Sequence, residues 1–256
     1  MSVTTMTDFP TGCVIVFGGS GGLGQAVAAL FAERGSDVVV THFSRPENGK
    51  AALDEIRRHG RSATTLQCSV ANQTSVDSVF TEAVKLHGRV HSVVTAMGQL
   101  YKLTPMVESI PAEFHGVMET DVTGFYNISR AAVAHMRKNG GGSITALVTC
   151  AYQKVYPDDA LSAVPKAAQR MMLRQIAVEE GPYGIRTNGV GVGLAAAGLA
   201  LVVPEIVAAW KEIEKATPLR RSCTAREIAE VVAFLASSRA AFVTGQIINC
   251  DGGLML

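Results

Sequence analysis

The chain has 256 residues, of which 48% are hydrophobic and 18% charged, a composition that excludes an intrinsically disordered chain. Its 23 basic and 22 acidic residues leave a net charge of +1, which offers no electrostatic footprint for nucleic acid or an anionic membrane. Residues 1–10 lack the basic and apolar regions of a signal peptide, and the five scattered cysteines show neither disulfide nor zinc spacing. We therefore expect a cytoplasmic protein that binds no metal, membrane or nucleic acid.

Short apolar runs alternate with longer helical patterns along the chain. The runs that predict strands are residues 13–18, 37–41, 63–68, 90–96, 143–149, 185–190 and 246–250. The patterns that predict helices are residues 22–34, 47–59, 73–87, 111–138, 165–179 and 225–236. Strands rich in valine and isoleucine, without polar alternation, are typical of a parallel sheet buried on both faces. We expect one doubly wound α/β (Rossmann) domain over residues 1–256.

Local signals mark two helix starts and one irregular segment. Thr224 and Glu227 have the spacing of a capping box, and Pro111 can open its helix because its missing N–H needs no partner there. The uncharged residues 187–204 approach the length of a membrane span, but four glycines interrupt them. A buried strand followed by a loop is the better interpretation. We expect the irregular stretch at 191–215 to be a lid over a site.

A glycine-rich loop, Gly18-Gly19-Ser20-Gly21-Gly22-Leu23-Gly24, joins the first predicted strand to the first helix. The loop fits both GxxxGxG and GxGxxG. A sharp turn, close approach of the backbone to a pyrophosphate and tight helix packing each exclude a Cβ, and the free N–H groups of the helix start face the anion. We predict a dinucleotide here, with contacts from Gly18, Ser20, Gly22, Leu23 and Gly24.

The end of the second strand predicts which dinucleotide is bound. NAD-binding folds usually carry an acid there for the adenosine ribose, whereas this chain reads Thr41-His42-Phe43-Ser44-Arg45. Thr41, His42, Ser44 and Arg45 are therefore candidates to hold the 2′-phosphate of NADP(H). We expect NADP(H) to be preferred, with NAD(H) possible; the alternative for Arg45 is a solvated loop cation.

Beyond the glycine loop, most of the chain resembles the short-chain dehydrogenase/reductase family. The resemblance rests on segments such as Lys166-Ala167-Ala168, Gly184-Ile185-Arg186-Thr187-Asn188, Val243-Thr244-Gly245-Gln246 and Asp251-Gly252-Gly253. It implies a seven-stranded sheet with helices on both faces, a nicotinamide cofactor, and a homodimer or homotetramer. Extra apolar faces on helices 111–138 and 165–179 also favour such an assembly. The family pattern implies further cofactor contacts at Ser69, Val70, Met97, Gly98, Lys166 and Gly193.

The family's catalytic positions hold unusual residues in this chain. Lys166 is in place, but Ser162 stands four residues earlier, where the family usually has tyrosine. Thr149 occupies the usual serine position and Asp121 the usual asparagine position. In carbonyl reduction the tyrosine gives a proton to oxygen, and a serine hydroxyl is much less acidic and shorter. An ordinary ketone-reductase mechanism is therefore not expected.

One branch of the family, the 2,4-dienoyl-CoA reductases, also has serine at that position and reduces an activated C=C bond. Residues 121–130 resemble the peroxisomal type, and Tyr152, fourteen residues before Lys166, resembles the upstream tyrosine of the mitochondrial type. This implies an apolar or acyl-type substrate. Tyr152 or Thr149 would donate to the thioester oxygen, and Asp121 would hold Lys166 or a water.

Two classes of function remain open at this point. The first is an NADP(H)-dependent reductase of an activated alkene or, alternatively, of a carbonyl; the second is a catalytically silent NADP-binding partner subunit. The candidate residues also have structural alternatives. Asp121 could simply pair with a cation, Tyr152 could be an exposed loop residue, Ser162 could cap a helix, and Lys166 could be a solvated surface lysine.

Overall fold

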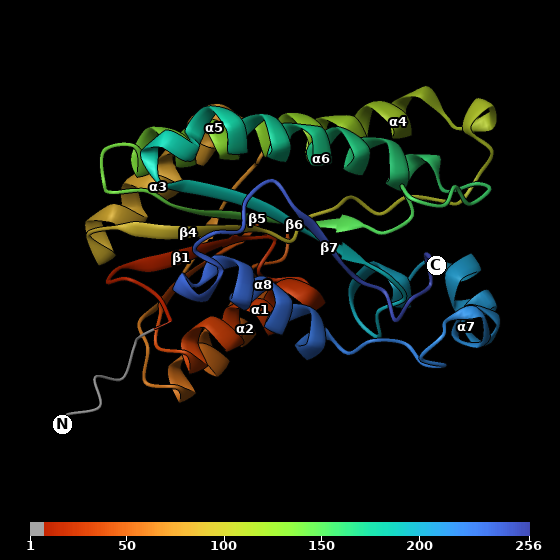
Figure 1. Ribbon diagram of the computed structural model, residues 1–256, viewed down its shortest axis with the longest axis horizontal. Coiled ribbons are helices and arrows are strands. Elements are labelled where there is room, and N and C mark those ends of the chain that lie inside the picture. The colour runs from red at the N-terminus through yellow and green to blue at the C-terminus, as the bar shows by residue number, and fades with distance from the viewer. Residues whose placement is uncertain (1–7) are drawn as a thin grey trace.

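A seven-stranded parallel sheet forms the centre of the structure, a computed structural model that describes residues 8–256 (Figure 1). The strands are β1 (Cys13–Phe17), β2 (Asp37–His42), β3 (Ala63–Gln67), β4 (Val90–Thr95), β5 (Gly142–Thr149), β6 (Ile185–Val192) and β7 (Ile247–Cys250). Their order is β3-β2-β1-β4-β5-β6-β7, so the winding direction reverses between β1 and β4. This arrangement confirms the predicted fold class, and every predicted strand agrees with the observed one to within two residues at either end.

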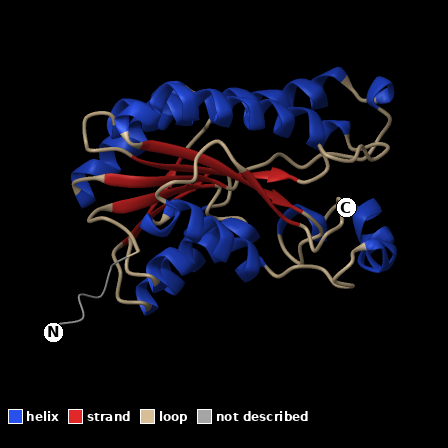
Figure 2. Ribbon diagram, in the orientation of Figure 1, coloured by secondary structure: helices blue, strands red, loops and turns tan. Residues whose placement is uncertain are grey.

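Helices cover both faces of the sheet (Figure 2). They are α1 (Gly22–Glu33), α2 (Pro46–Arg58), α3 (Gln73–His87), α4 (Pro111–Val117), α5 (Gly124–Met136), α6 (Ala160–Glu180), α7 (Pro204–Ala216) and α8 (Ala225–Ala236). Helices α1, α2 and α8 lie on one face, and α3, α4, α5 and α6 lie on the other (Figure 1). Helix α7 lies near the C-terminus, beyond the end of the sheet (Figure 1).

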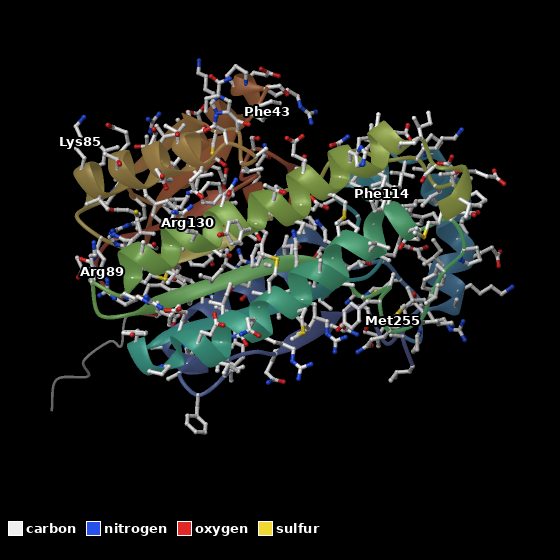
Figure 3. All side chains as sticks on the ribbon, turned by 90° about the horizontal axis from the view of Figure 1, so that it is seen from above. Phe43, Lys85, Arg89, Phe114, Arg130 and Met255 are labelled. Atoms are coloured by element: carbon white, nitrogen blue, oxygen red, sulfur yellow. The ribbon has the colours of Figure 1, made fainter. Side chains whose placement is uncertain are left out.

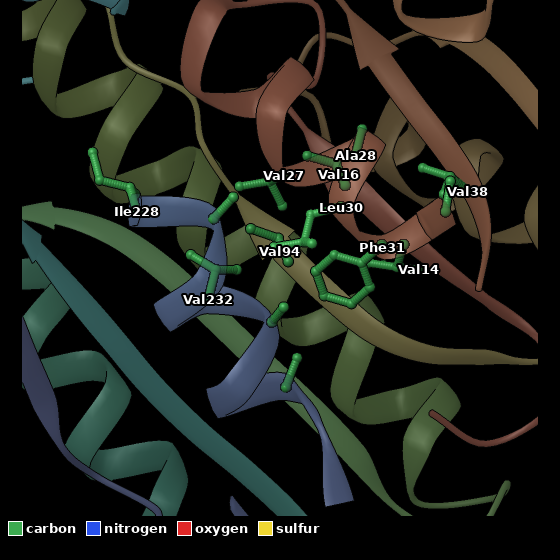
Figure 4. Close-up of a cluster of buried hydrophobic side chains, with 14 of the residues drawn as sticks. Val14, Val16, Val27, Ala28, Leu30, Phe31, Val38, Val94, Ile228 and Val232 are labelled. Atoms are coloured by element: carbon green, nitrogen blue, oxygen red, sulfur yellow. The ribbon is translucent and has the colours of Figure 1, made fainter. Parts of the chain in front are cut away.

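Successive residues of β1 belong to opposite layers of the core. Val14 and Val16 join a cluster with Phe31 of α1 and residues of α8 (Figure 4). Ile15 and Phe17 join a second cluster with residues of α3 and α5. Because side chains alternate along a strand and both faces are covered, each position of β1 has to be apolar.

Helix α6 begins earlier than predicted. The prediction placed its start at Pro165, but the helix starts at Ala160, so Pro165 lies inside it. The first turn forms because the N–H groups of Ser162 and Ala163 both donate to the carbonyl of Asp159, at 3.1 and 2.9 Å. Pro165 is the sixth residue of the helix, so its missing N–H leaves the carbonyl of Leu161 without the usual i→i−4 hydrogen bond.

The single helix predicted over 111–138 is interrupted. Helix α4 passes into a π-helical turn, Met118–Thr123, before α5 begins, and α5 ends at Met136. A π turn changes the direction of the side chains within it, and such turns often occur at functional sites. Asp121 is buried in this turn. The two predicted helix starts are confirmed, since Pro111 opens α4 and the Thr224–Glu227 capping box opens α8.

The segment after β6 is more regular than predicted. Strand β6 continues to Val192, a 3₁₀ turn spans Gly198–Leu201, and α7 occupies most of the remaining part of 191–215. The prediction missed α7 although Pro204 and Glu205 form an ordinary helix start. Over residues 8–256, no helix combines the length and apolar character needed to span a membrane.

Candidate active site

The loops that follow β1, β4, β5 and β6 meet at one edge of the sheet, because these strands are parallel neighbours. Doubly wound folds bind ligands at this carboxyl edge, in the crevice where the strand order reverses. Three groups of predicted site residues follow from this topology. The glycine loop leaves β1, Met97 and Gly98 leave β4, and Gly193 leaves β6.

The glycine loop is packed too tightly for larger residues. A Cβ on Gly24 would lie 2.3 Å from the carbonyl oxygen of Gly18, and one on Gly18 would lie 2.8 Å from the backbone of Ala96 and Met97. Gly18 also has a φ of +78°, a conformation that favours glycine. Gly22 and Leu23 open α1, whose N-cap residue makes no side-chain capping bond, so the first N–H groups are available to an anion. The loop therefore fits a pyrophosphate.

The residues predicted to hold a 2′-phosphate lie between β2 and α2. Ser44 and Arg45 are exposed, and Arg45 is the N-cap residue of α2. His42 Nδ1 lies 3.1 Å from the hydroxyl of Thr65 on β3. Thr41 is buried, and its hydroxyl accepts a hydrogen bond from the Gly18 N–H at 3.2 Å, which positions the glycine loop.

The backbones of Ser69 and Val70, which follow β3, are hydrogen-bonded to side chains of α3 and α5. The Ser69 N–H donates to the Ser75 hydroxyl at 3.0 Å, and the Val70 carbonyl accepts from the Asn127 amide at 2.9 Å. The Val70 side chain lies against α5, since a Cβ on Gly124 would lie 2.7 Å from it. These bonds hold the end of β3 beside α5.

A buried ion pair joins α6 to the π turn. Lys166 Nζ donates to Asp121 Oδ2 at 2.6 Å, and the two side chains are only 12% and 6% exposed. Gln169 donates to the backbone carbonyl of Asp121 at 2.5 Å. Burial raises the pKa of Asp121, and the Lys166 charge opposes that rise. Within residues 8–256 the second carboxylate oxygen, Oδ1, is buried and accepts no hydrogen bond, so it is available to a water or a substrate donor.

Ser162 lies one turn before Lys166 on the same face of α6. Its backbone N–H donates to the carbonyl of Asp159 at 3.1 Å. The hydroxyl of Tyr101, which comes from the loop after β4, donates to Asp159 Oδ1 at 3.4 Å. Burial, followed by the negative charge of Asp159, raises the pKa of Tyr101 to about 12, and burial raises the pKa of Asp159 to about 6.

Sequence reasoning missed Tyr101 and Asp159. The sequence could have indicated them, because Tyr101 follows the fourth predicted strand and Asp159 follows the fifth. In a parallel sheet both loops lie at the carboxyl edge. Neither residue lies in a segment that carries the family resemblance.

The other two catalytic candidates contact different groups. The hydroxyl of Thr149, the last residue of β5, accepts a hydrogen bond from the backbone N–H two residues further on, at 3.1 Å. The Tyr152 hydroxyl lies 3.5 Å from Asn249 Oδ1, and the Arg170 guanidinium lies 4.3 Å from the centre of the Tyr152 ring. The contacts of Tyr152 are thus with β7 and a later turn of α6, whereas Ser162 and Asp121 are the candidates grouped with Lys166.

The segment after β6 lies against the predicted cofactor loop. A Cβ on Gly22 would lie 2.9 Å from the N atom of Gly198, and one on Gly98 would lie 3.4 Å from the Leu199 side chain. Gly193 packs on the next strand end, where its Cβ would lie 2.6 Å from Asp251 Cα. Residues 197–199 therefore cover the backbone to which the cofactor is predicted to bind. In the part of the chain that the structure describes, no group of three or more His, Cys, Asp or Glu side chains is arranged to hold a metal ion.

Comparison with known proteins places this geometry among oxidoreductases. A family model described as enoyl-(acyl carrier protein) reductase matches residues 18–255. The chain is 30% identical over 244 residues to the 7alpha-hydroxysteroid dehydrogenase of Escherichia coli (strain K12), covering 94% of this chain and 93% of that one. A short-chain type dehydrogenase/reductase from Mycobacterium ulcerans superimposes with a TM-score of 0.91 at 26% identity, covering 97% and 91% of the two chains. Levodione reductase gives the same TM-score and identity, covering 96% and 98%.

Proposed function

This chain belongs to the short-chain dehydrogenase/reductase family of NAD(P)-dependent oxidoreductases, and we propose that it uses NADPH to reduce an activated C=C bond. The substrate is a small, mostly apolar molecule such as an enoyl or dienoyl thioester. The observation that carries this proposal is the buried Lys166–Asp121 pair, with Ser162 one turn earlier. A serine and an aspartate thus stand where ketone-reducing members of the family usually have tyrosine and asparagine, beside the lysine that is in its usual place. The description of the matching family model agrees with such a reaction.

The chain's own residues would have distinct tasks in this reaction. The nicotinamide, when bound, supplies the hydride. Lys166 would hold the ribose hydroxyls and add positive charge to the site. Asp121 Oδ1, buried without a hydrogen-bond partner among the described residues, would accept a hydrogen bond from the water that delivers a proton to carbon. Thr149 or Tyr152 would donate to the thioester oxygen, on which negative charge collects.

The preference for NADP(H) over NAD(H) is part of the proposal. It is supported by the absence of a carboxylate at the end of β2 and by the exposed Ser44 and Arg45 beside it. The acid of β2, Asp37, lies at the opposite end of the strand and pairs with Arg61 at 2.8 Å. An exposed guanidinium at a helix start is well placed to bind a 2′-phosphate.

Reaction at a carbonyl or hydroxyl group is the second candidate. It is favoured by the relative named 7alpha-hydroxysteroid dehydrogenase, which aligns over most of both chains. In carbonyl reduction a side chain of the site has to transfer a proton to the substrate oxygen. In alkene reduction a hydrogen bond that stabilises the negative charge on that oxygen is sufficient.

We also propose a homodimer or homotetramer. Three residues of α6 spaced by seven, Val164, Met171 and Val178, are 36%, 57% and 78% exposed and form one apolar stripe. Tyr126 of the neighbouring α5 is exposed as well. The two helices lie side by side on the outside of the molecule (Figure 3). An apolar stripe of this kind is stable when a second copy covers it.

The proposed function is tested by following NADPH oxidation with enoyl and dienoyl thioesters, then with cyclic enones, and finally with the matching saturated ketones. We expect turnover of conjugated alkenes, loss of turnover in Lys166→Met, and no change in the control Lys85→Met, which removes an exposed lysine of α3. Reduction of ketones alone would favour the second candidate. Tight NADPH binding without any turnover would favour the silent-subunit alternative and contradict the proposal.

A further inference from the structure

The structure brings a phenol from another loop to the position where the family's catalytic tyrosine is missing. Tyr101 belongs to the loop after β4, and its hydroxyl donates to Asp159 Oδ1 at 3.4 Å. Asp159 lies three residues before Ser162, whose N–H donates to the Asp159 carbonyl at 3.1 Å. Because Ser162 occupies the family's tyrosine position, the phenol is held at the start of the same helical turn although Tyr101 is 61 positions away in the chain.

A second hydrogen bond joins the loop that contains Tyr101 to the loop after β5. The N–H of Thr104 donates to the carbonyl of Asp158 at 3.0 Å. Asp158 has a φ of +67°, so this residue turns in a conformation that non-glycine residues seldom adopt. With the Tyr101–Asp159 contact, two bonds join the loops within a few residues. The phenol is therefore held by tertiary structure on the active-site edge.

We propose that Tyr101 is a catalytic residue that donates its hydroxyl hydrogen to the substrate's carbonyl oxygen, and that Asp159 positions it and returns its proton. The proposal rests on the function proposed above, because it requires a substrate in which hydride addition to carbon places charge on an oxygen. Conjugated thioesters, enones and ketones all meet that requirement.

Tyr101 fits this role better than the nearby alternatives. A serine hydroxyl such as that of Ser162 is a much weaker acid than a phenol. Tyr152 has its hydroxyl beside Asn249. The interaction with Ser162 lowers the pKa of Tyr101, against the larger upward effect of burial. Since the net result is about 12, the phenol stays protonated near neutrality and the site is equipped to give a proton rather than to remove one.

The proton transfers balance for both kinds of substrate. Hydride from the reduced nicotinamide forms a C–H bond, and the electron pair of the π bond moves to oxygen. With a ketone, the O–H bond of Tyr101 breaks and its proton joins that oxygen; the Asp159 carboxylate then takes one proton from solvent water and passes it to the phenolate, so that both groups return to their starting states. With a conjugated alkene, the Tyr101 hydroxyl donates a hydrogen bond to the enolate oxygen, and water supplies the proton that ends on carbon.

The direct test is Tyr101→Phe, which removes one oxygen atom and keeps the ring. We expect kcat to fall by about 10²-fold or more, the usual effect of losing a positioned acid, while the dissociation constant for NADPH changes by less than about threefold. Tyr183→Phe is the matched control, because Tyr183 lies at the other end of β6 and stacks on Arg137. A second variant, Tyr101→Ala with Ser162→Tyr, moves the phenol to the family's usual position and should recover about tenfold or more over Tyr101→Ala.

Asp159 is tested by the pH dependence of kcat/KM. The titratable groups around it are Tyr101 and Cys150, and the charge of Asp121 acts on the same phenol. The pKa of Cys150 is raised to about 12, mainly by burial, so it does not titrate near pH 6. We expect Asp159→Asn to remove an inflection near pH 6 that Asp121→Asn leaves in place.

The outcomes separate this inference from the proposed function. Wild-type turnover together with Tyr101→Phe retaining more than about a third of kcat would overturn the role of Tyr101 and leave the proposed function standing. A wild-type protein that reduces no thioester, enone or ketone would overturn both. If Tyr101→Phe also loses NADPH binding, the phenol-swap variant decides: recovery supports the role of Tyr101, and no recovery overturns it.

Discussion

Replacing Lys166 with methionine should destabilise the protein strongly, because it leaves the Asp121 carboxylate buried without its counter-charge. Removing one partner of a buried ion pair typically costs about 3–5 kcal/mol. Lys166 retains 12% exposure, so some water reaches the pair, and we expect the lower end of that range. For a chain of this length, about 3 kcal/mol corresponds to a fall in Tm of roughly 6–12 °C.

The destabilisation should depend on pH in a defined direction. Burial raises the pKa of Asp121 in the folded state, and Lys166 limits that rise. Without Lys166 the folded-state pKa rises further above the unfolded value, so over the interval between the two pKa values the folded state binds more protons than the unfolded state does. Stability then falls as pH increases through that interval. Lys166→Met should therefore lie closer to wild type at pH 5 than at pH 8.

Thermal unfolding at constant protein concentration measures this effect, since assembly would otherwise shift Tm. Lys166→Met is compared with the double variant Lys166→Met with Asp121→Asn, which removes both charges and should regain part of the loss. Lys85→Met controls for loss of a lysine. A fall in Tm below about 2 °C for Lys166→Met, or equal falls at pH 5 and pH 8, would refute the reasoning.

Three further predictions concern the cofactor and the assembly. Arg45→Ala should weaken NADPH binding by about tenfold and leave NADH binding unchanged in calorimetry, with Arg57→Ala as the control on the same helix; an equal effect on both cofactors would contradict the 2′-phosphate assignment. Gly24→Ala should abolish detectable binding of either cofactor, because its Cβ meets a carbonyl oxygen at 2.3 Å, whereas Gly181→Ala, with nothing within 4 Å, should bind normally. Met171→Glu should lower the mass measured by light scattering at micromolar concentration, and a monomeric wild type would refute the proposed assembly.

The amino-acid sequence by itself determined the fold class and the position of the glycine loop after β1. Most of the strands are short apolar runs with turn signals next to them in the chain, so local pattern is enough to place them. The glycine pattern is equally local, since the close approach at Gly24 is to Gly18 and Gly19 of the same turn, although the approach of Gly18 to Ala96 and Met97 is a tertiary contact. The missing acid at the end of β2 could likewise be seen without a structure.

The family resemblance already placed Asp121 near Lys166, but tertiary structure alone decided that this pair is buried and that Tyr101 meets Asp159 at the carboxyl edge of the sheet. Asp121 and Lys166 are 45 residues apart, and the π turn that buries Asp121 interrupts a stretch whose local pattern predicts an ordinary helix. Tyr101 and Asp159 are 58 residues apart, and they meet because the loops after β4 and β5 leave neighbouring parallel strands at the same edge. The periodicity of apolar residues indicates which face of a helix or strand is buried. It does not indicate which loop side chains come into contact once the strands pack side by side.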